Sequence, residues 1–362
     1  MKELMEPIRE KDVLRYSLEG LRGDLPRNWR WQVEERPKSV PGRFDAIVEI
    51  ESPGGQKAML AVEAKRLVLG RDVSQMLAQI EKKIATAGLK NAIPLLVGRY
   101  LPPSTRERLE GLGVSYADAT GNRLLTLEQP ALFVRSAGEN RDPWRGPGRP
   151  RGTLKGAPAA KVARWLADNR PPYTALQIAG GSGASTGATY RVLRFLEEEG
   201  LIERAPGGAV TSVEWRPLLE RGSRDFGFQR TEPVESLLFP RGLDALVETL
   251  RAQPSLRYVL TGSLAAKRYE AYAATRFAML YADDVEEVIR KLDLRRVDAG
   301  ANVLVAVDRD EVAFVRAGEL DGVRLAAPSQ IAVDLLSGPG RSPSEGEALM
   351  DWMESNERDW RS

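Results

Sequence analysis

Hydrophobic positions in the first 138 residues alternate between helical and strand spacing. The helical spacing predicts helices over residues 10–22, 74–87 and 104–112. Short apolar runs bounded by Pro or Gly predict strands at residues 29–34, 43–50, 57–65, 92–100, 114–117 and 124–134. This order of elements favours an α/β domain with a mixed sheet over residues 1–138.

The remaining chain divides by composition and spacing. A Pro/Gly/Arg-rich stretch at residues 139–155 predicts a linker. Residues 156–217 predict three helices and a hairpin, with helices at residues 159–169, 174–179 and 185–199, a turn at 180–183 and a hairpin at 203–215. A connecting region, 218–253, leads to an α/β unit at 254–362 with strands at residues 257–260, 277–281, 303–307 and 312–315 and helices at 285–291, 329–336 and 344–354. A chain of 362 residues with this pattern predicts a multidomain α/β protein.

Composition removes several classes of chemistry. The chain contains neither Cys nor His, which excludes disulfides, thiolate zinc sites and Ser-His-Asp triads. It has no apolar run long enough to span a membrane, and its charged start, Met1-Lys2-Glu3, does not resemble a signal peptide. We therefore expect a cytoplasmic protein without a membrane partner.

Two carboxylates and a lysine form the most specific pattern. Asp45 lies in one predicted strand, and the next strand contains Glu63 and Lys65. Because strand side chains alternate, Glu63 and Lys65 share a face while Ala64 points away, and a hairpin brings Asp45 beside them. Carboxylate oxygens suit a hard cation, and a positive group near the attacking water suits phosphodiester cleavage.

This pattern resembles the PD-(D/E)xK nuclease superfamily over residues 10–135, although Phe44 stands where a proline usually precedes the Asp. The resemblance implies a restriction-endonuclease-like fold. It implies that Asp45 and Glu63 hold Mg²⁺ with the Ala64 carbonyl, that Lys65 acts on the water or the developing charge, and that Glu19 is a candidate additional acid. Two alternatives stay open: an exposed salt-bridged face, or a fold that binds DNA without cutting it.

Arginine dominates the basic residues, and the segment from Arg141 to Arg216 has a larger basic excess than the whole chain, whose net charge is +2. Pro147-Gly148-Arg149-Pro150-Arg151 resembles the core of an AT-hook, which implies that Arg149 and Arg151 enter the DNA minor groove. The alternative is a flexible basic linker.

Residues 156–217 resemble a winged helix-turn-helix domain of bacterial transcriptional regulators, most closely in the run from Arg191 to Ile202. In that architecture the start of the third helix enters the major groove. The resemblance implies DNA contacts by Ser185, Thr186, Thr189, Tyr190, Arg191, Arg194 and Arg204. A winged helix that binds protein is the alternative.

The last unit begins with Tyr258 to Arg268, which looks like the opening of a nucleotidyltransferase-like fold and implies a nucleotide at Gly262 and Ser263. The next strand carries no carboxylate pair before Asp283 and Asp284, so nucleotidyl transfer is not expected. An ordinary turn that starts a helix is the alternative for Gly262. Residues 254–362, including 327–336, resemble the C-terminal domain of AbiEi-like antitoxins of type IV toxin–antitoxin systems.

These patterns predict a double-stranded DNA-binding protein, an antitoxin-like transcriptional regulator with a nuclease-fold domain. The runner-up is a Mg²⁺-dependent endonuclease in defence or repair, and the third reading is a partner-binding antitoxin. The partners that follow are duplex DNA, a second copy of the chain and a toxin-like protein. Whether the protein is an enzyme stays open at this point.

Overall fold

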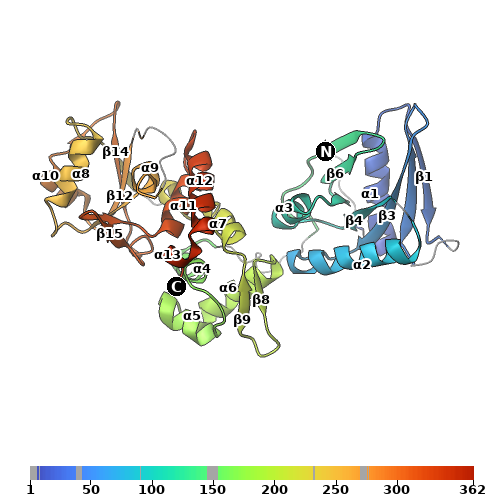
Figure 1. Cartoon of the computed structure of the whole chain (residues 1–362), viewed down its shortest axis with the longest axis horizontal. Coiled ribbons are helices and arrows are strands. Elements are labelled where there is room, and N and C mark those ends of the chain that lie inside the picture. Colours follow the sequence, from blue (N-terminus) through green and yellow to red (C-terminus); the bar gives the residue numbers. More distant parts are fainter. Residues whose placement is uncertain are drawn as a thin grey trace. The chain divides into compact units, whose positions relative to one another are not determined.

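The computed structural model describes residues 6–7, 9–37, 43–89, 91–144, 154–230, 233–269, 275 and 277–362. The fold is mixed α/β, and the chain divides into two compact units, residues 1–149 with 198–200, and residues 150–197 with 201–362. Figure 1 labels many of the helices and strands of both units. No helix in the described ranges is long and apolar enough to cross a membrane.

The first unit is built on a sheet whose strands lie in sequence order. They are β1 (Arg30–Glu35), β2 (Ala46–Glu51), β3 (Lys57–Lys65), β4 (Ala92–Gly98), β5 (Ser115–Asp118), β6 (Arg123–Leu127) and β7 (Leu132–Ser136). Strands β3, β4 and β5 run parallel, whereas the other neighbours are antiparallel. The carboxyl ends of β3 to β5 therefore meet at one edge of the sheet.

Helices cover both faces of this sheet. They are α1 (Glu10–Asp24), the short 3-10 helix η1 (Gly70–Asp72), α2 (Val73–Thr86) and α3 (Pro103–Gly111). Helix α1 buries Leu14 and Leu18 in a cluster with Val62, whereas α2 buries Ile80 in a cluster with Ala61. Because adjacent strand residues point to opposite faces, α1 and α2 lie on opposite faces of the sheet.

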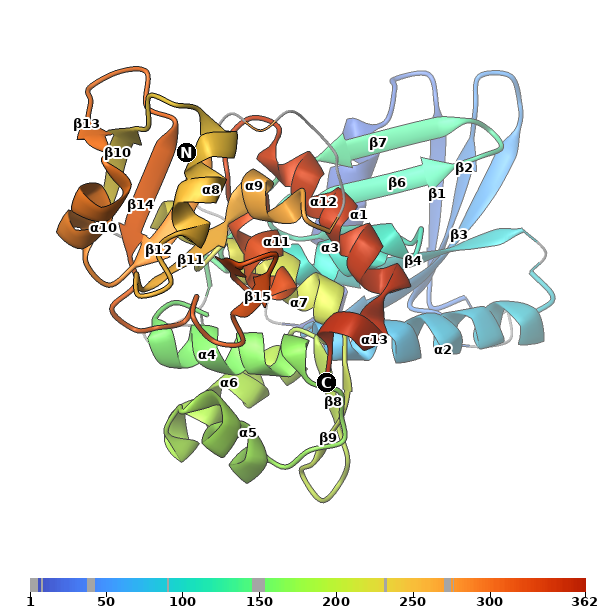
Figure 2. The same cartoon turned by 60° about the vertical axis from the view of Figure 1, so that its left-hand side comes forward.

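The strand predicted over residues 124–134 is instead a hairpin of β6 and β7, visible in Figure 2. Leu127 pairs with Leu132, and residues 128–131 form the turn. Pro130 lies in that turn, and proline has no backbone N–H to donate to a sheet. The prediction of one continuous strand was wrong. The apolar residues on the two sides of the turn belong to two antiparallel strands, and their spacing alone does not reveal the turn between them.

The predicted linker begins with residues that pack on the first unit. The Tyr100 hydroxyl donates to the carbonyl of Asn140 over 2.8 Å, and the Arg99 guanidinium pairs with Asp142. At the other end, Leu154 is fully buried in the second unit, and its N–H donates to Asp225 over 2.8 Å. Described residues at both ends of the predicted linker therefore pack on the folded units.

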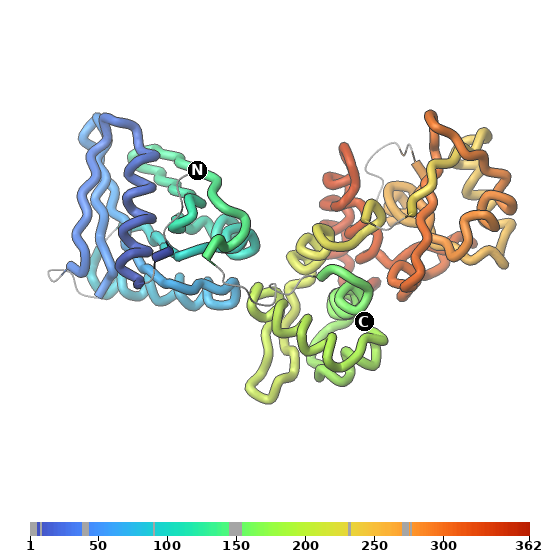
Figure 3. Tube along the Cα trace, turned by 180° about the vertical axis from the view of Figure 1, so that it is seen from behind, coloured from blue at the N-terminus to red at the C-terminus, as the bar shows by residue number. Residues whose placement is uncertain are grey.

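The second unit begins with three helices and a hairpin, followed by a helix and a short 3-10 helix. These are α4 (Ala157–Asp168), α5 (Ala175–Ser182), α6 (Thr186–Glu198), β8 (Ile202–Arg204), β9 (Val210–Val213), α7 (Trp215–Ser223) and η2 (Phe228–Arg230). Figure 3 shows the β8–β9 hairpin extending beyond the helices. The turn predicted at residues 180–183 is shorter than expected, because residues 180–182 continue α5 and only Gly183, at φ 70°, ends it in the left-handed region.

A second sheet follows, in the order β13-β10-β14-β12-β11-β16-β15. Its strands are β10 (Val234–Leu238), β11 (Tyr258–Thr261), β12 (Ala278–Ala282), β13 (Arg295–Arg296), β14 (Val303–Val307), β15 (Gly318–Leu320) and β16 (Val323–Leu325). The accompanying helices are α8 (Leu243–Arg251), α9 (Gly262–Ala266), α10 (Val285–Leu292), α11 (Pro328–Leu336), α12 (Ser342–Ser355) and α13 (Glu357–Trp360). The strand predicted at residues 312–315 is a turn, since Asp308 accepts the N–H of Ala313 over 2.6 Å and Val315 donates back to Val312.

A single core and a buried polar network join the three-helix segment to the second sheet. Leu166 and Leu193 belong to the same hydrophobic cluster as Leu260 and Ile331. Arg164 of α4 is fully buried and donates to three side chains. Its partners are Ser329, at 3.1 Å, Gln330, and Asp168, at 3.4 Å. These contacts fix α4 against α11, so the three-helix segment and the sheet fold as one body.

Candidate functional site

The hairpin of β2 and β3 places Asp45 beside the end of β3. Ala46 pairs with Val62, and the N–H of Asp45 donates to the Val62 carbonyl over 3.2 Å. The side chain of Asp45 then turns toward β3, where Oδ2 accepts the N–H of Ala64 over 2.8 Å. This bond fixes one carboxylate next to Glu63.

Glu63 and Lys65 lie on the α2 face of the sheet. Ala64 and Val62 are buried in the α1 cluster, so the residues between and after them point the other way. Nζ of Lys65 lies 3.8 Å from Oε1 of Glu63. The structure thus brings together all three residues that the sequence pattern selected, whereas Glu19 is exposed on α1, on the opposite side of the sheet.

A second lysine, which the sequence reasoning missed, completes the cluster. Nζ of Lys83, in α2, lies 2.6 Å from Oε2 of Glu63 and 3.4 Å from the Arg43 carbonyl. The signal for it is the spacing in α2: Met76 and Ile80 are buried, and Lys83 follows at the interval that keeps it on the same helical face. We define Asp45, Glu63, Lys65 and Lys83 as the carboxylate–lysine cluster.

The donor set of this cluster fits a hard divalent cation with few protein ligands. Mg²⁺ commonly binds through one or two carboxylates and keeps several waters. Asp45 and Glu63 offer two carboxylates, and no group of three or more acidic ligands suited to a metal occurs among the described residues. Any cation held here therefore keeps most of its water, which suits a site that also binds a phosphate.

The segment predicted to contact DNA presents a polar face at the start of α6. Ser185, Thr186, Arg191 and Arg194 are exposed, and Tyr190 is 49% exposed. The hydroxyl of Ser185 accepts the N–H of Ala188 over 3.3 Å at the helix start. Five of the residues selected from the sequence for this helix therefore lie on one accessible surface.

Thr189 does not belong to that surface. Its side chain is fully buried, and its hydroxyl donates to the carbonyl of Ser185 over 3.1 Å. Thr189 lies three positions before Val192 and four before Leu193, both of which are in the core, so it shares their inward face. The assignment of Thr189 to DNA contact was wrong for this reason.

Arg204 and Arg216 of the segment form hydrogen bonds and ion pairs within the protein. Arg204 donates to the Gly208 carbonyl over 3.2 Å and lies 3.5 Å from Glu197. Arg216 pairs with Glu347, Asp351 and Glu354 of α12. With Arg164 buried, the basic excess counted from Arg141 to Arg216 overstates the charge available to a ligand. Arg149 and Arg151 lie outside the described residues.

The residues of the predicted nucleotide site have structural roles in the second unit. Gly262 and Ser263 begin α9, which is only five residues long, and Gly262 has φ 64° with Met279 packed against it. Asp284 caps α10 by accepting the N–H of Glu286 over 2.8 Å, and Asp283 pairs with Arg257. The two carboxylates thus have partners away from Gly262, and nucleotide binding stays a prediction.

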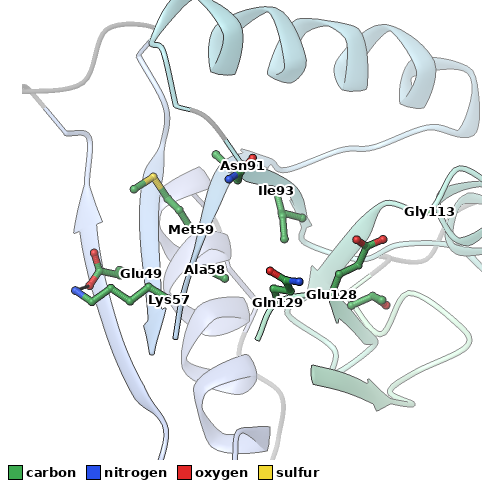
Figure 4. A pocket seen from close by; sticks show the side chains of 11 residues that line it. Glu49, Lys57, Ala58, Met59, Asn91, Ile93, Gly113, Glu128 and Gln129 are labelled. Carbon is green, nitrogen blue, oxygen red and sulfur yellow. Dashed lines mark hydrogen bonds and ion pairs between the residues drawn. The ribbon is translucent and has the colours of Figure 1, made fainter. Parts of the chain in front are cut away.

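A pocket of about 870 Å³ opens in the first unit at the other end of β3 (Figure 4). Its rim contains Lys57, which pairs with Glu49 over 2.6 Å, and Glu128 lies in another part of its lining. Lys57 and Glu63 are six positions apart on one strand, which corresponds to roughly 20 Å. The pocket is therefore separate from the carboxylate–lysine cluster.

Comparisons with known proteins identify no relative: no family model matches the chain, and no curated protein or solved structure matches it.

Proposed function

We propose that the protein binds double-stranded DNA through residues 156–217, acting as a winged helix-turn-helix, and that it regulates transcription. The observation that carries the proposal is the exposed polar face at the start of α6, which bears Tyr190, Arg191 and Arg194. Leu166 of α4, Ile178 of α5 and Leu193 of α6 are buried in one hydrophobic cluster, and in this reading the β8–β9 hairpin corresponds to the wing. The N-terminal half of such a helix fits the width of the major groove.

The chemistry of this face suits a duplex. Arginine forms paired hydrogen bonds with guanine or with phosphate, and hydroxyl groups bond to phosphates or bases. Gly187 has no side chain that could stand between α6 and a ligand. The space beside it is open, since a Cβ built there would meet only Arg191, at 3.9 Å. The α6 face therefore permits close approach of a groove, with Arg191 and Arg194 as its charged contacts.

Binding of a labelled duplex at several salt concentrations tests this proposal. The double variant Arg191→Ala/Arg194→Ala is expected to bind more weakly and to reduce the slope of log affinity against log salt by about 2, since each phosphate contact contributes about 0.9. Tyr190→Ala is expected to weaken binding without loss of fold. The control, Arg290→Ala, changes an exposed arginine on α10 and is expected to bind as the wild type does.

Unchanged binding by the double variant would reject the α6 face as the DNA surface. A wild-type protein that binds no duplex at low salt would reject the function itself.

A second candidate function rests on the carboxylate–lysine cluster: a Mg²⁺-dependent endonuclease of the PD-(D/E)xK type. Asp45 and Glu63 would hold the ion, with the Ala64 carbonyl as a further ligand. A bound Mg²⁺ would supply Lewis-acid stabilisation of the phosphate and a more acidic water. Lys65 is half-exposed beside Glu63, where its ammonium group can stabilise negative charge on a phosphate that enters from solvent.

Incubation of plasmid with Mg²⁺ or Mn²⁺ separates the two functions. Cleavage by the wild type that is lost in both Asp45→Asn and Lys65→Ala supports the endonuclease. Asn at position 45 keeps an acceptor for the Ala64 N–H, so the hairpin is retained. A plasmid that stays intact with the wild type leaves regulation as the function.

A further inference from the structure

Glu63 has two ammonium groups beside it, and the one outside the sequence motif is the closer. Lys83 lies 2.6 Å from Oε2 of Glu63, whereas Lys65 lies 3.8 Å from Oε1. The side chain of Lys83 is 27% exposed and that of Lys65 is 41% exposed, around a Glu63 that is 12% exposed. Because water screens Lys83 less, its attraction to Glu63 is the stronger of the two.

Several contacts hold the Lys83 ammonium in this position. It donates to the Arg43 carbonyl, two residues before Asp45, and lies 5.9 Å from the centre of the Phe44 ring. Its helix is fixed by Ile80, which is fully buried against the sheet. Lys83 therefore links the chain just ahead of Asp45 with the carboxylate of Glu63.

We propose that Lys83 is an internal counter-ion of Glu63, which a divalent cation must displace in order to bind Asp45 and Glu63. This inference rests on the metal-binding part of the second candidate function. A divalent cation on Glu63 meets the positive charge of an ammonium that already occupies one carboxylate oxygen, and like charges at such distances repel. Removal of the Lys83 charge favours binding of the cation, because no ammonium group of Lys83 then competes with the cation for Glu63.

Titration of the full-length protein with Mn²⁺, with free Mn²⁺ measured by electron paramagnetic resonance, tests the proposal without any assay of activity. Lys83→Met keeps an apolar stem of similar length and removes the charge. It is expected to bind Mn²⁺ more tightly than the wild type, by up to about fivefold, which corresponds to the upper range for a single ion pair near the surface. Lys83→Arg keeps the charge and is expected to retain the wild-type affinity.

The matched control is Lys82→Met, the exposed neighbour on the same helix, for which we expect the wild-type affinity. Adding Glu63→Gln to Lys83→Met is expected to remove the gain, which locates the ion. If Lys83→Met does not fold, as judged by circular dichroism, Lys83→Gln is used with the same expectation. An affinity for Mn²⁺ equal to or weaker than that of the wild type, in a folded Lys83 variant, overturns the proposal.

The counter-ion role and the proposed functions fail in different ways. Tighter Mn²⁺ binding by Lys83→Met without any plasmid cleavage supports the counter-ion role and rejects the endonuclease. If neither the wild type nor the Lys83 variants bind Mn²⁺ in a way that depends on Glu63, the counter-ion role is rejected together with the metal site. Neither result changes the test of DNA binding, which uses residues of α6 alone.

Discussion

The hydroxyl of Tyr281 donates a hydrogen bond to Oδ1 of Asp334 over 2.9 Å in the interior of the second unit. The same carboxylate accepts bonds from the Phe228 N–H and the Gln330 amide, each at 2.8 Å, and from the Thr261 hydroxyl at 2.5 Å. Asp334 therefore connects α11 with β11, β12 and the 3-10 helix η2. Burial nonetheless dominates its ionisation and raises its pKa to about 6.

This shift makes the stability of the second unit depend on pH. The pKa of Asp334 is higher in the folded state than its ordinary value of 3.8, so folding favours the protonated form. Its contribution is complete below about pH 4 and is lost as pH rises through 6, by roughly 3 kcal/mol in all. In Asp334→Asn the position cannot titrate, and the amide oxygen can still accept the three bonds made to Oδ1.

The measurement is the free energy of unfolding, from urea denaturation at pH 4 and pH 7, for the wild type and Asp334→Asn. We expect the variant to gain roughly 2 kcal/mol relative to the wild type between these pH values, since part of the total change falls below pH 4. Asp244→Asn, at an exposed position in α8, serves as control and is expected to show little change. A difference between wild type and Asp334→Asn that is the same at both pH values would contradict the role of Asp334.

Arg164 is predicted to stabilise the fold and to make no contact with DNA. Arg164→Met leaves Asp168 without its buried cationic partner, and breaking such a pair from one side costs about 3–5 kcal/mol. The midpoint of thermal unfolding should fall accordingly. Arg170→Met, which removes an arginine 41% exposed beside Glu357, is expected to cost less than about 1 kcal/mol. Normal stability with weakened duplex binding in Arg164→Met would show that the buried position is wrong.

Gly262 is predicted to be required by the backbone and by packing. Its φ is 64°, and a Cβ at this position would lie 2.5 Å from Sδ of Met279. Gly300 has a similar φ of 75°, but a Cβ there would meet open space. Gly300→Ala is thus expected to cost about 1–2 kcal/mol from the left-handed backbone alone, and Gly262→Ala more than that.

Thermal unfolding of the two alanine variants measures this difference. Equal destabilisation would mean that Met279 moves aside without cost, and Gly262 would then be explained by its backbone conformation alone. A Gly262→Ala protein as stable as the wild type would contradict both reasons for a glycine here.

Local patterns in the chain determined most elements and one part of a candidate site. Alternation along β3 placed Glu63 and Lys65 on one face, and helical spacing located α1, α2 and α6, because both depend on residues close in sequence. Two strand predictions were wrong for the same reason: the apolar pattern resumes after the turn that contains Pro130, and the apolar run at residues 312–315 pairs with no strand of the described sheet.

Tertiary packing decided which charged and polar side chains are accessible. Arg164 and Arg191 are both arginines on predicted helices, yet one lies against α11 and the other faces solvent. Lys83 reached Glu63 only because α2 packs on that face of the sheet, whereas Thr189 faces inward through its spacing to Val192 and Leu193 on the same helix. The contacts of Lys83 with Glu63 and of Arg164 with Gln330 join residues 20 and 166 positions apart, so no local pattern in the sequence contains them.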